Sequence, residues 1–373
     1  MTDFLRQARA GVQHLAPYQP GKPVEELQRE LGLAKIVKLA SNENPLGPSP
    51  QALAAMRRLL AADPAELGRY PDGNGYVLKD AIHRRFGWAH ERITLGNGSN
   101  DVLELVARAF LGEGDDAIYA QHAFAVYPLA VRAVNARGIE VPARDFGHDL
   151  PAMAAAVTPA TKVVFLANPN NPTGTWFEAD AFAEFMAAVP PHVVVVLDEA
   201  YCEFVSDPQA LDGFAVLDRH PNLIVSRTLA KAYGLASLRV GYAVASAEIT
   251  GILNRVRQPF NVNSLALVAG AAAMADSDFV ARSRALNDAG RQQWLEGLRA
   301  LGLTAIPSRG NFLCVDMSQP ALPLFQALLR EGVIVRPVAN YGLPDHLRIS
   351  IGLPEENAFA LAALARVLDG ARA

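Results

Sequence analysis

The stretch His192–Tyr201, HVVVVLDEAY, indicates the fold class of this chain. Four consecutive valines and a leucine leave no polar face, a pattern that is typical of a strand buried on both sides. Asp198 ends the run, and a carboxylate there needs a partner because an unpaired buried charge is costly. The stretch therefore predicts a strand of a largely parallel sheet, with a polar site at its carboxyl end. A helix N-cap is the alternative role for Asp198.

Five further apolar runs are also predicted to be strands. Segments with helical spacing of apolar residues, such as 101–110 and 178–188, lie between them, as in βαβ units. This alternation predicts an α/β domain over residues 45–260. The strand-like runs are Arg92–Leu95, Ala117–Ala120, Lys162–Ala167, Leu223–Ser226 and Arg239–Ala245.

The sequence after Asn261 has a different character. Helical segments rich in Ala, Leu and Arg precede three short strand-like runs and a closing helix. We therefore expect a smaller α+β domain over 261–373, with residues 1–44 as an N-terminal arm that contributes to this domain and to the functional site. The helical segments are 264–275, 279–301 and 355–371, and the runs are NFLCVDM (311–317), VIVRPV (333–338) and LRISIG (347–352).

Composition and charge exclude several classes of partner. The 373 residues are 51% hydrophobic, and Lys plus Arg (34) against Asp plus Glu (38) give a net charge of −4. This balance argues against nucleic acid and against an anionic membrane surface. No apolar run approaches the roughly 20 residues of a membrane span. The two cysteines, Cys202 and Cys314, are predicted to be free thiols, Cys202 in core packing, so we expect a cytoplasmic protein and no metal site.

A lysine and an arginine follow the strand Leu223–Ser226. Lys231 in TLAK (228–231) lies just beyond this buried strand, where a lowered pKa would make it a nucleophilic amine able to form a Schiff base. Most lysines are solvated surface charges, which is the ordinary alternative. Arg239, eight residues further on, is suited to bind a phosphate.

Other strand ends carry polar loops. GNGSNDVLEL (96–105) presents Ser99 and Asn100 at a helix N-terminus, which suits a phosphate, although an ordinary N-cap is an equal alternative. NPNNPTG (168–174), which follows the strand Lys162–Ala167, is predicted to be either an ordinary loop or a specific functional motif. Arg348 stands among apolar residues in HLRISIG (346–352), which indicates recognition of a carboxylate or phosphate, or a structural ion pair. Together these groups describe a site for pyridoxal 5′-phosphate.

The chain resembles the fold-type I aminotransferases on NPNNPTG, DEAY and KAYGLASLRVG (231–241). It is most similar to their histidinol-phosphate aminotransferase subfamily on LASNENPLGPSP (39–50), RYPDGNG (69–75) and the arginines of VIVRP and LRISIG. The likeness covers nearly the whole chain. It implies a large domain with a mostly parallel seven-stranded sheet, a smaller α+β domain, and pyridoxal 5′-phosphate as cofactor.

The resemblance also implies roles for individual residues. Lys231 would form the Schiff base and then move the substrate proton, and Asp198 would pair with the pyridinium nitrogen. Tyr201 and Asn171 would bind the ring oxygen O3′, and Phe124 would stack on the ring. The phosphate would be held by Ser99, Asn100, Thr228 and Arg239, and by Tyr70 of a neighbouring subunit in a homodimer. The implied substrate-binding residues are Tyr18, Asn44, Arg336 and Arg348.

The implied reaction is a ping-pong exchange in histidine biosynthesis between L-histidinol phosphate and 2-oxoglutarate. Two features depart from the family pattern. Ala230 replaces the common serine, so one hydrogen bond to the phosphate is expected to be missing, and PVANYGLP (337–344) with Tyr341 resembles a branch expected to act on phenylalanine or tyrosine. An aromatic aminotransferase, a threonine-phosphate decarboxylase and a non-catalytic effector-binding module are the alternatives.

Overall fold

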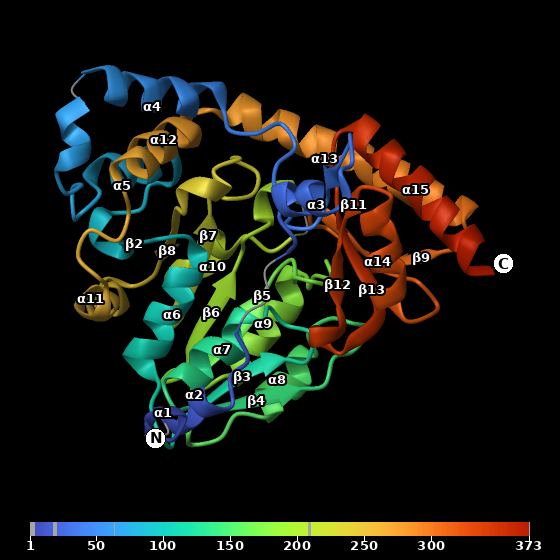
Figure 1. The fold of residues 1–373 in the computed structure, drawn as a ribbon. Helices are drawn as coiled ribbons and strands as arrows, with labels where there is room; N and C mark the ends of the chain where they lie inside the picture. Colours follow the sequence, from blue (N-terminus) through green and yellow to red (C-terminus); the bar gives the residue numbers. More distant parts are fainter. Residues whose placement is uncertain (1–3, 18–20, 63, 208–209, 373) are drawn as a thin grey trace.

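The strand that ends at Asp198 is the central strand of a seven-stranded sheet in the computed structural model, which describes residues 4–17, 21–62, 64–207 and 210–372 (Figure 1). The strands lie in the order β2-β8-β7-β6-β5-β3-β4. β8 is antiparallel to both of its neighbours, and the other pairs are parallel. Their bounds are β2 Ile93–Gly96, β3 Asp116–Ala120, β4 Arg137–Val141, β5 Thr161–Ala167, β6 Val194–Asp198, β7 Leu223–Thr228 and β8 Gly241–Val244.

The sheet confirms the predicted α/β fold, and its register brings the polar strand ends together. Asp198 pairs with Ala167 of β5 and with Ser226 of β7, so the carboxyl ends of three strands meet at one edge. The six apolar runs found in the sequence correspond to β2, β3, β5, β6, β7 and β8. β4 was not among them, because it is an edge strand of which only Val141 is buried, and it carries the polar residues Arg137 and Glu140.

Helices cover the sheet and share its core, which is the largest in the described part of the chain. α6 and α7 pack against each other, α8 packs against α9, and α12 lies along α4 and α5 (Figure 1). The bounds are α4 Pro50–Ala62, α5 Tyr76–Phe86, α6 Ser99–Phe110, α7 Val126–Ala133, α8 Leu150–Ala155, α9 Ala179–Ala188, α10 Gly213–Val216, α11 Ala247–Val256 and α12 Ser264–Ala275.

A second, four-stranded antiparallel sheet has its own core. Its strands lie in the order β12-β13-β10-β9, and α13, α14 and α15 pack around it (Figure 1). The run VIVRPV, expected as one strand, is divided at Val335 into β11 and β12. The bounds are β9 Thr304–Ile306, β10 Phe312–Asp316, β11 Val333–Ile334, β12 Arg336–Val338, β13 Leu343–Ser350, α13 Ser277–Ala300, α14 Ala321–Arg330 and α15 Pro354–Arg372.

The long helix α13 contributes to the hydrophobic cores of both domains. α12 and Val280 of α13 belong to the larger core, whereas Trp294 and Leu298 of α13 belong to the smaller one. We therefore propose that the limit lies within α13 and not at residue 260.

The N-terminal arm contacts both parts of the molecule. β1 (Val37–Lys38) pairs with β11, and α3 (Val24–Leu31) packs beside it, on the smaller domain. The short helices α1 (Phe4–Gln7) and α2 (Ala10–Gln13) lie at the other end of the arm, and α2 packs against α7.

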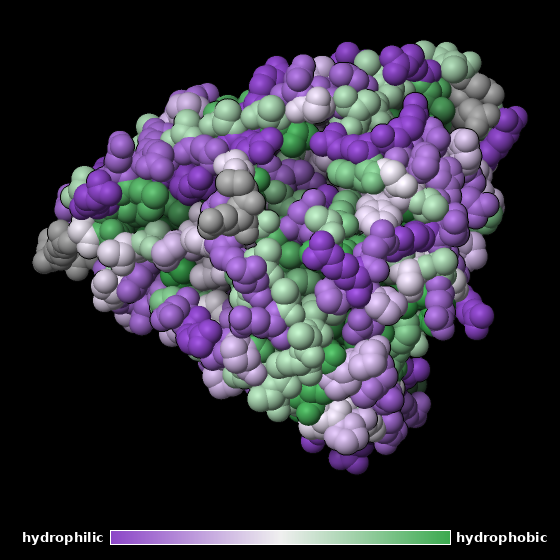
Figure 2. All heavy atoms as spheres, turned by 180° about the vertical axis from the view of Figure 1, so that it is seen from behind, coloured by the Kyte–Doolittle hydropathy of each residue, from purple (hydrophilic) through white to green (hydrophobic). Residues whose placement is uncertain are grey.

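The surface mixes polar and apolar side chains. On the face opposite to that of Figure 1, hydrophilic residues predominate and apolar residues lie in smaller patches between them (Figure 2). Within the described ranges no single helix is long and apolar enough to cross a membrane; α12 and α13 meet that test only as a pair bent by 79°.

Candidate active site

A cavity of about 170 Å³ opens at the carboxyl edge of the large sheet, between the two sheets. The larger sheet and its loops line one side, and the loop Ala40–Asn42 with two arginines of the smaller sheet lines the other. The cavity gathers eleven of the residues singled out in the sequence: Ser99, Asn100, Phe124, Asn171, Asp198, Tyr201, Thr228, Lys231, Arg239, Arg336 and Arg348.

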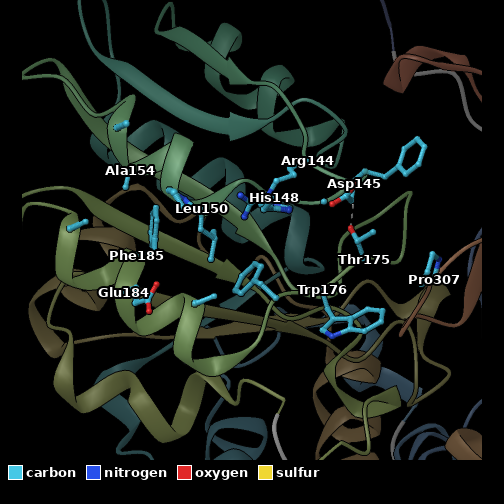
Figure 3. A pocket seen from close by; sticks show the side chains of 17 residues that line it. Arg144, Asp145, His148, Leu150, Ala154, Thr175, Trp176, Glu184, Phe185 and Pro307 are labelled. Atoms are coloured by element: carbon cyan, nitrogen blue, oxygen red, sulfur yellow. Dashed lines mark hydrogen bonds between the residues drawn. The ribbon is translucent and has the colours of Figure 1, made fainter.

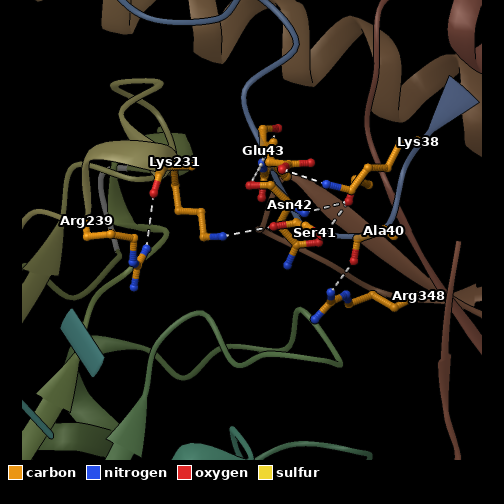
Figure 4. A network of polar contacts seen from close by, with 11 residues as sticks. Lys38, Ala40, Ser41, Asn42, Glu43, Lys231, Arg239 and Arg348 are labelled. Carbon is orange, nitrogen blue, oxygen red and sulfur yellow. Dashed lines mark hydrogen bonds and ion pairs between the residues drawn. The ribbon is translucent and has the colours of Figure 1, made fainter. Parts of the chain in front are cut away.

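Lys231 holds its amine inside this cavity. Nζ donates a hydrogen bond to the backbone oxygen of Ser41 at 3.0 Å (Figure 4). Burial, with the positive charge of Arg348, lowers the pKa of Lys231 to about 8. A larger fraction of neutral amine is therefore present near neutral pH than in an ordinary lysine, which favours a nucleophilic role.

Asp198 presents one engaged and one free oxygen. Oδ2 accepts a hydrogen bond from the Tyr127 hydroxyl at 2.9 Å, whereas Oδ1 is buried with no hydrogen-bond partner in the described chain. Burial raises the pKa of Asp198 to about 6, and the donation from Tyr127 opposes that rise. A buried carboxylate oxygen without a donor is costly, so this atom suits a cationic or N–H partner.

Tyr201 is held from the smaller domain's side of the cavity. The side-chain nitrogen of Asn42 donates to the Tyr201 hydroxyl at 3.0 Å, and burial raises the pKa of this phenol to about 12. Asn42 itself is fixed by Ser350 of β13, whose hydroxyl accepts from the Asn42 backbone N–H at 2.8 Å. Tyr201 therefore remains protonated and free to donate its own hydrogen into the cavity.

The N-terminus of α6 forms an anion-binding corner. The helix begins at Ser99 without a side-chain cap, and its first residues, Ser99 and Asn100, line the cavity. Arg239 lies directly against the loop, because a side chain at Gly98 would meet its guanidinium at 2.6 Å. Gly98 also has a φ of +83°, which glycine adopts without strain. Unsatisfied N–H groups beside a guanidinium are suited to a phosphate.

Two arginines face the cavity from the smaller sheet. Arg336 on β12 and Arg348 on β13 are direct partners in the antiparallel register. Arg348 is buried and donates to Asn171 Oδ1 at 2.5 Å and to the Ala40 carbonyl at 2.6 Å, while its Nε has no partner in the described residues. This pair supplies two guanidinium groups for an anionic ligand.

Two of the predicted residues that the structure describes, Asn44 and Tyr70, do not line the cavity. Asn44 is buried behind it, where its amide donates to the Ala232 carbonyl and to the Ser283 hydroxyl. The loop turns Asn42 and not Asn44 toward the cavity, and a substrate contact of Asn44 stays a prediction. Tyr70 is 83% exposed and stacks on Phe260 at 4.8 Å. Tyr18 lies outside the described residues.

Sequence reasoning missed three residues that contact the predicted ones, namely Ser41, Asn42 and Tyr127. Asn42 and Ser41 belong to the quoted stretch LASNENPLGPSP, of which only Asn44 was predicted as a site residue. Tyr127 lies in the HAFAVYP segment (122–128), three residues after Phe124. One helical turn separates the two positions, which is the signal that could have linked them.

A larger groove of about 1040 Å³ lies between α8 and α9 (Figure 3). Apolar side chains such as Leu150 and Phe185 form most of its wall, and none of the predicted site residues lines it. Its His148 is half-buried, accepts a hydrogen bond from the Ala167 backbone N–H, and has a pKa lowered to about 4 by desolvation. The charged residues that line the groove are Arg144, Asp145 and Glu184, so it lacks the lysine and the paired arginines that distinguish the cavity at the sheet edge.

The fold and the site together define the class: a fold-type I transferase in which a lysine, a carboxylate and a phenol meet at the carboxyl edge of the large sheet. The chain belongs to the class I and II aminotransferases, whose family model matches residues 34–364.

Similar proteins narrow this placement. A histidinol-phosphate aminotransferase 2 of Pseudomonas aeruginosa is 61% identical over 370 residues and 99% of both chains. A histidinol-phosphate aminotransferase 1 of Mannheimia succiniciproducens is 54% identical over 366 residues, 98% of this chain and 99% of the relative. The crystal structure of histidinol-phosphate aminotransferase from Sinorhizobium meliloti in complex with pyridoxal-5′-phosphate matches with a TM-score of 0.88 at 29% identity and covers 97% of each chain. The predicted family and fold class are thus confirmed.

Proposed function

We propose that this aminotransferase uses pyridoxal 5′-phosphate to exchange the amino group between L-histidinol phosphate and 2-oxoglutarate, in histidine biosynthesis. The observation that carries the proposal is the meeting of Lys231, the free oxygen of Asp198, the α6 N-terminus and two arginines in one cavity. The relatives named for this reaction, at up to 61% identity, support the choice of substrate. Cys202 and Cys314 are free thiols, which favours a reducing compartment such as the cytoplasm.

The residues of the cavity fit this cofactor. The α6 N-terminus with Thr228 and Arg239 would hold its phosphate. The buried oxygen Asp198 Oδ1, which has no donor in the described chain, would accept a hydrogen bond from the ring N–H. Ala230, where a serine is common, lines the cavity, and its backbone N–H is bound by the Thr228 hydroxyl at 3.1 Å. When bound, pyridoxal phosphate supplies a carbonyl that condenses with amines and a ring that delocalises negative charge.

The chain's own groups position and move protons. Lys231 Nζ, with its lowered pKa, would take the proton from the substrate carbon Cα and deliver it to the cofactor carbon C4′ on the same face. Asp198 would keep the ring nitrogen protonated through its negative charge, and Tyr201, fully protonated, would donate to the ring oxygen together with Asn171. Phe124 would cover one face of the ring and exclude water there.

Arg336 and Arg348 would bind the anionic end of each substrate in turn. The two guanidinium groups face the same cavity, so they can meet the phosphate of one substrate and the carboxylates of the other. The carboxylate of a purely aromatic substrate such as phenylalanine carries one negative charge, whereas the phosphate of histidinol phosphate carries about −1.5 to −2 and can meet both guanidinium groups. This pairing favours the phosphorylated substrate over the aromatic alternative.

A visible-absorbance titration of the reconstituted protein tests the substrate. L-histidinol phosphate is expected to convert the cofactor band at far lower concentration than L-phenylalanine does. Arg336→Ala should raise the KM for histidinol phosphate about tenfold to a hundredfold, since a charge-assisted hydrogen bond is lost. The matched control is Arg366→Ala on α15. It removes a surface ion pair with Glu331, which follows α14, and should leave KM unchanged. Preference for phenylalanine, or an unaltered KM in R336A, would contradict the assignment.

We also propose that the protein is a homodimer in which Tyr70 reaches the neighbouring site. Tyr70 and Phe260 stack on each other at the surface, where they are 83% and 43% exposed, and Phe260 adopts a φ of +59°. An exposed aromatic pair of this kind is typical of an interface. Sedimentation equilibrium is expected to give twice the chain mass of 40.0 kDa, and a value of one chain mass would refute the dimer.

A further inference from the structure

Tyr127 is a completely buried tyrosine that lies just behind the cavity. It is 0% exposed, belongs to the first turn of α7, and is not among the residues that line the cavity. Its hydroxyl nevertheless donates to Asp198 Oδ2 at 2.9 Å, across 71 residues of sequence. This hydroxyl is the one side-chain donor to Asp198 in the described part of the chain.

The ring of Tyr127 contacts a second residue of the site. It stacks on Phe165 of β5 at 4.9 Å with an interplanar angle of 10°. The same ring packs perpendicular to that of Phe124, which lines the cavity, with ring centroids 5.9 Å apart and an interplanar angle of 88°. The β5 strand thus fixes Tyr127, and Tyr127 in turn contacts both Asp198 and Phe124.

We propose that Tyr127 is a positioning residue that sets the charge of the ring-nitrogen partner and the orientation of the ring-covering phenylalanine at once. The proposal rests on the proposed function, because it assumes that Asp198 faces a protonated ring nitrogen. Tyr127 acts through its two neighbours and does not touch the cofactor.

The chemical reason lies in where one proton resides. A donor to Oδ2 makes the Asp198 carboxylate less basic, so the proton between Oδ1 and the ring nitrogen stays on the ring. Without that donor the proton moves toward Asp198 and the ring loses its positive charge. A neutral ring withdraws fewer electrons, which raises the proton affinity of the nitrogen that Lys231 contributes to the cofactor.

The surroundings contain few other groups that titrate. Tyr201 and Tyr341 lie near Tyr127, and Glu199 and Lys231 lie near Asp198. Burial raises the pKa of Tyr127 well above its usual value, so this tyrosine stays protonated. Glu199 is paired with Arg227 at 2.7 Å, so its charge is compensated. A pH-dependent change in the absorbance of the bound cofactor therefore reports mainly on the cofactor, Lys231 and Asp198.

The test compares the holoprotein with Tyr127→Phe, which removes one oxygen and keeps the ring. We expect the pH midpoint of the visible-absorbance change to rise, and the dissociation constant of pyridoxal phosphate to increase about tenfold to a hundredfold, the range for a hydrogen bond to a charged group. Tyr127→His, which keeps a ring N–H, should recover part of both changes, and it also carries the test if the phenylalanine variant is too unstable to purify.

Tyr242→Phe is the matched control. Tyr242 is also buried, at 1% exposure, but its hydroxyl has no hydrogen-bond partner in the described chain and it does not line the cavity. The control should change neither the midpoint nor the dissociation constant. A normal cofactor band with an unshifted midpoint in Y127F would overturn this inference alone, even if that variant were less stable. Failure of the unmodified protein to form the band would overturn the proposed function and this inference with it.

Discussion

Replacing Lys231 with alanine is expected to lower kcat by at least about 10⁴-fold, since both covalent attachment and general acid–base catalysis are lost. No other lysine lines the cavity, within the residues that the structure describes. The other cationic side chains that line it belong to Arg239, Arg336 and Arg348, and a guanidinium group does not act as a base in proteins. The neighbouring groups therefore cannot take over the role of this amine.

Single-turnover absorbance measurements with L-glutamate check this result. In K231A the cofactor should still bind but should no longer be held covalently, so borohydride should fail to fix it to the protein. In the unmodified protein, the rate of covalent capture should rise with pH through about 8, because only the neutral amine reacts. Lys162→Ala at the start of β5, remote from the cavity, is the control and should retain full activity. Retained turnover in K231A would rule out Lys231 as the reactive amine.

Replacing Asp198 with asparagine is expected to lower kcat by about 10²- to 10³-fold, the usual cost of removing one preorganised electrostatic contact. The amide has nearly the shape of the carboxylate but no charge, so it cannot keep the ring nitrogen protonated. The loss should therefore fall on kcat more than on the KM of either substrate. Steady-state kinetics with both substrates would show the difference.

Asp288→Asn, a partly exposed α13 residue that pairs with Arg291, serves as the control for the same chemical change. Reconstitution of D198N with a cofactor analogue that carries a permanent positive charge at the ring nitrogen should restore part of the rate. Normal kinetics in D198N would show that the charge of Asp198 is not needed.

The sequence predicted those parts of the site that follow single buried strands. The apolar run ending at Asp198, the lysine after β7 and the helix after β2 could be placed at one edge because parallel strands bring their carboxyl ends together. The paired arginines were found for a similar reason, as charges inside otherwise apolar strands. The assignment of individual roles came from the family resemblance, and those roles stay predictions.

The rest could not be predicted because it depends on packing between distant segments. Asn42 contacts Tyr201 across 159 residues, and it reaches the cavity because a φ of +55° turns the chain there. An asparagine that adopts this conformation looks no different in sequence from Asn44, two positions later. Tyr127 shows no sign of its bond to Asp198 in an apolar helix, and β4 is too polar to stand out as a strand.

The two sides of the cavity have separate origins, which has a consequence for how such enzymes diversify. Groups suited to the cofactor come from the large sheet and its loops, whereas Arg336 and Arg348 come from neighbouring strands of the small sheet, with a different hydrophobic core. Substitutions in β12 can therefore alter which anion is accepted without removing a contact of the lysine or its carboxylate, whereas Arg348 of β13 also lowers the pKa of Lys231, so its replacement would affect both. Substrate range is separable from chemistry in this architecture, and directed evolution for new amino donors would best begin in the small sheet.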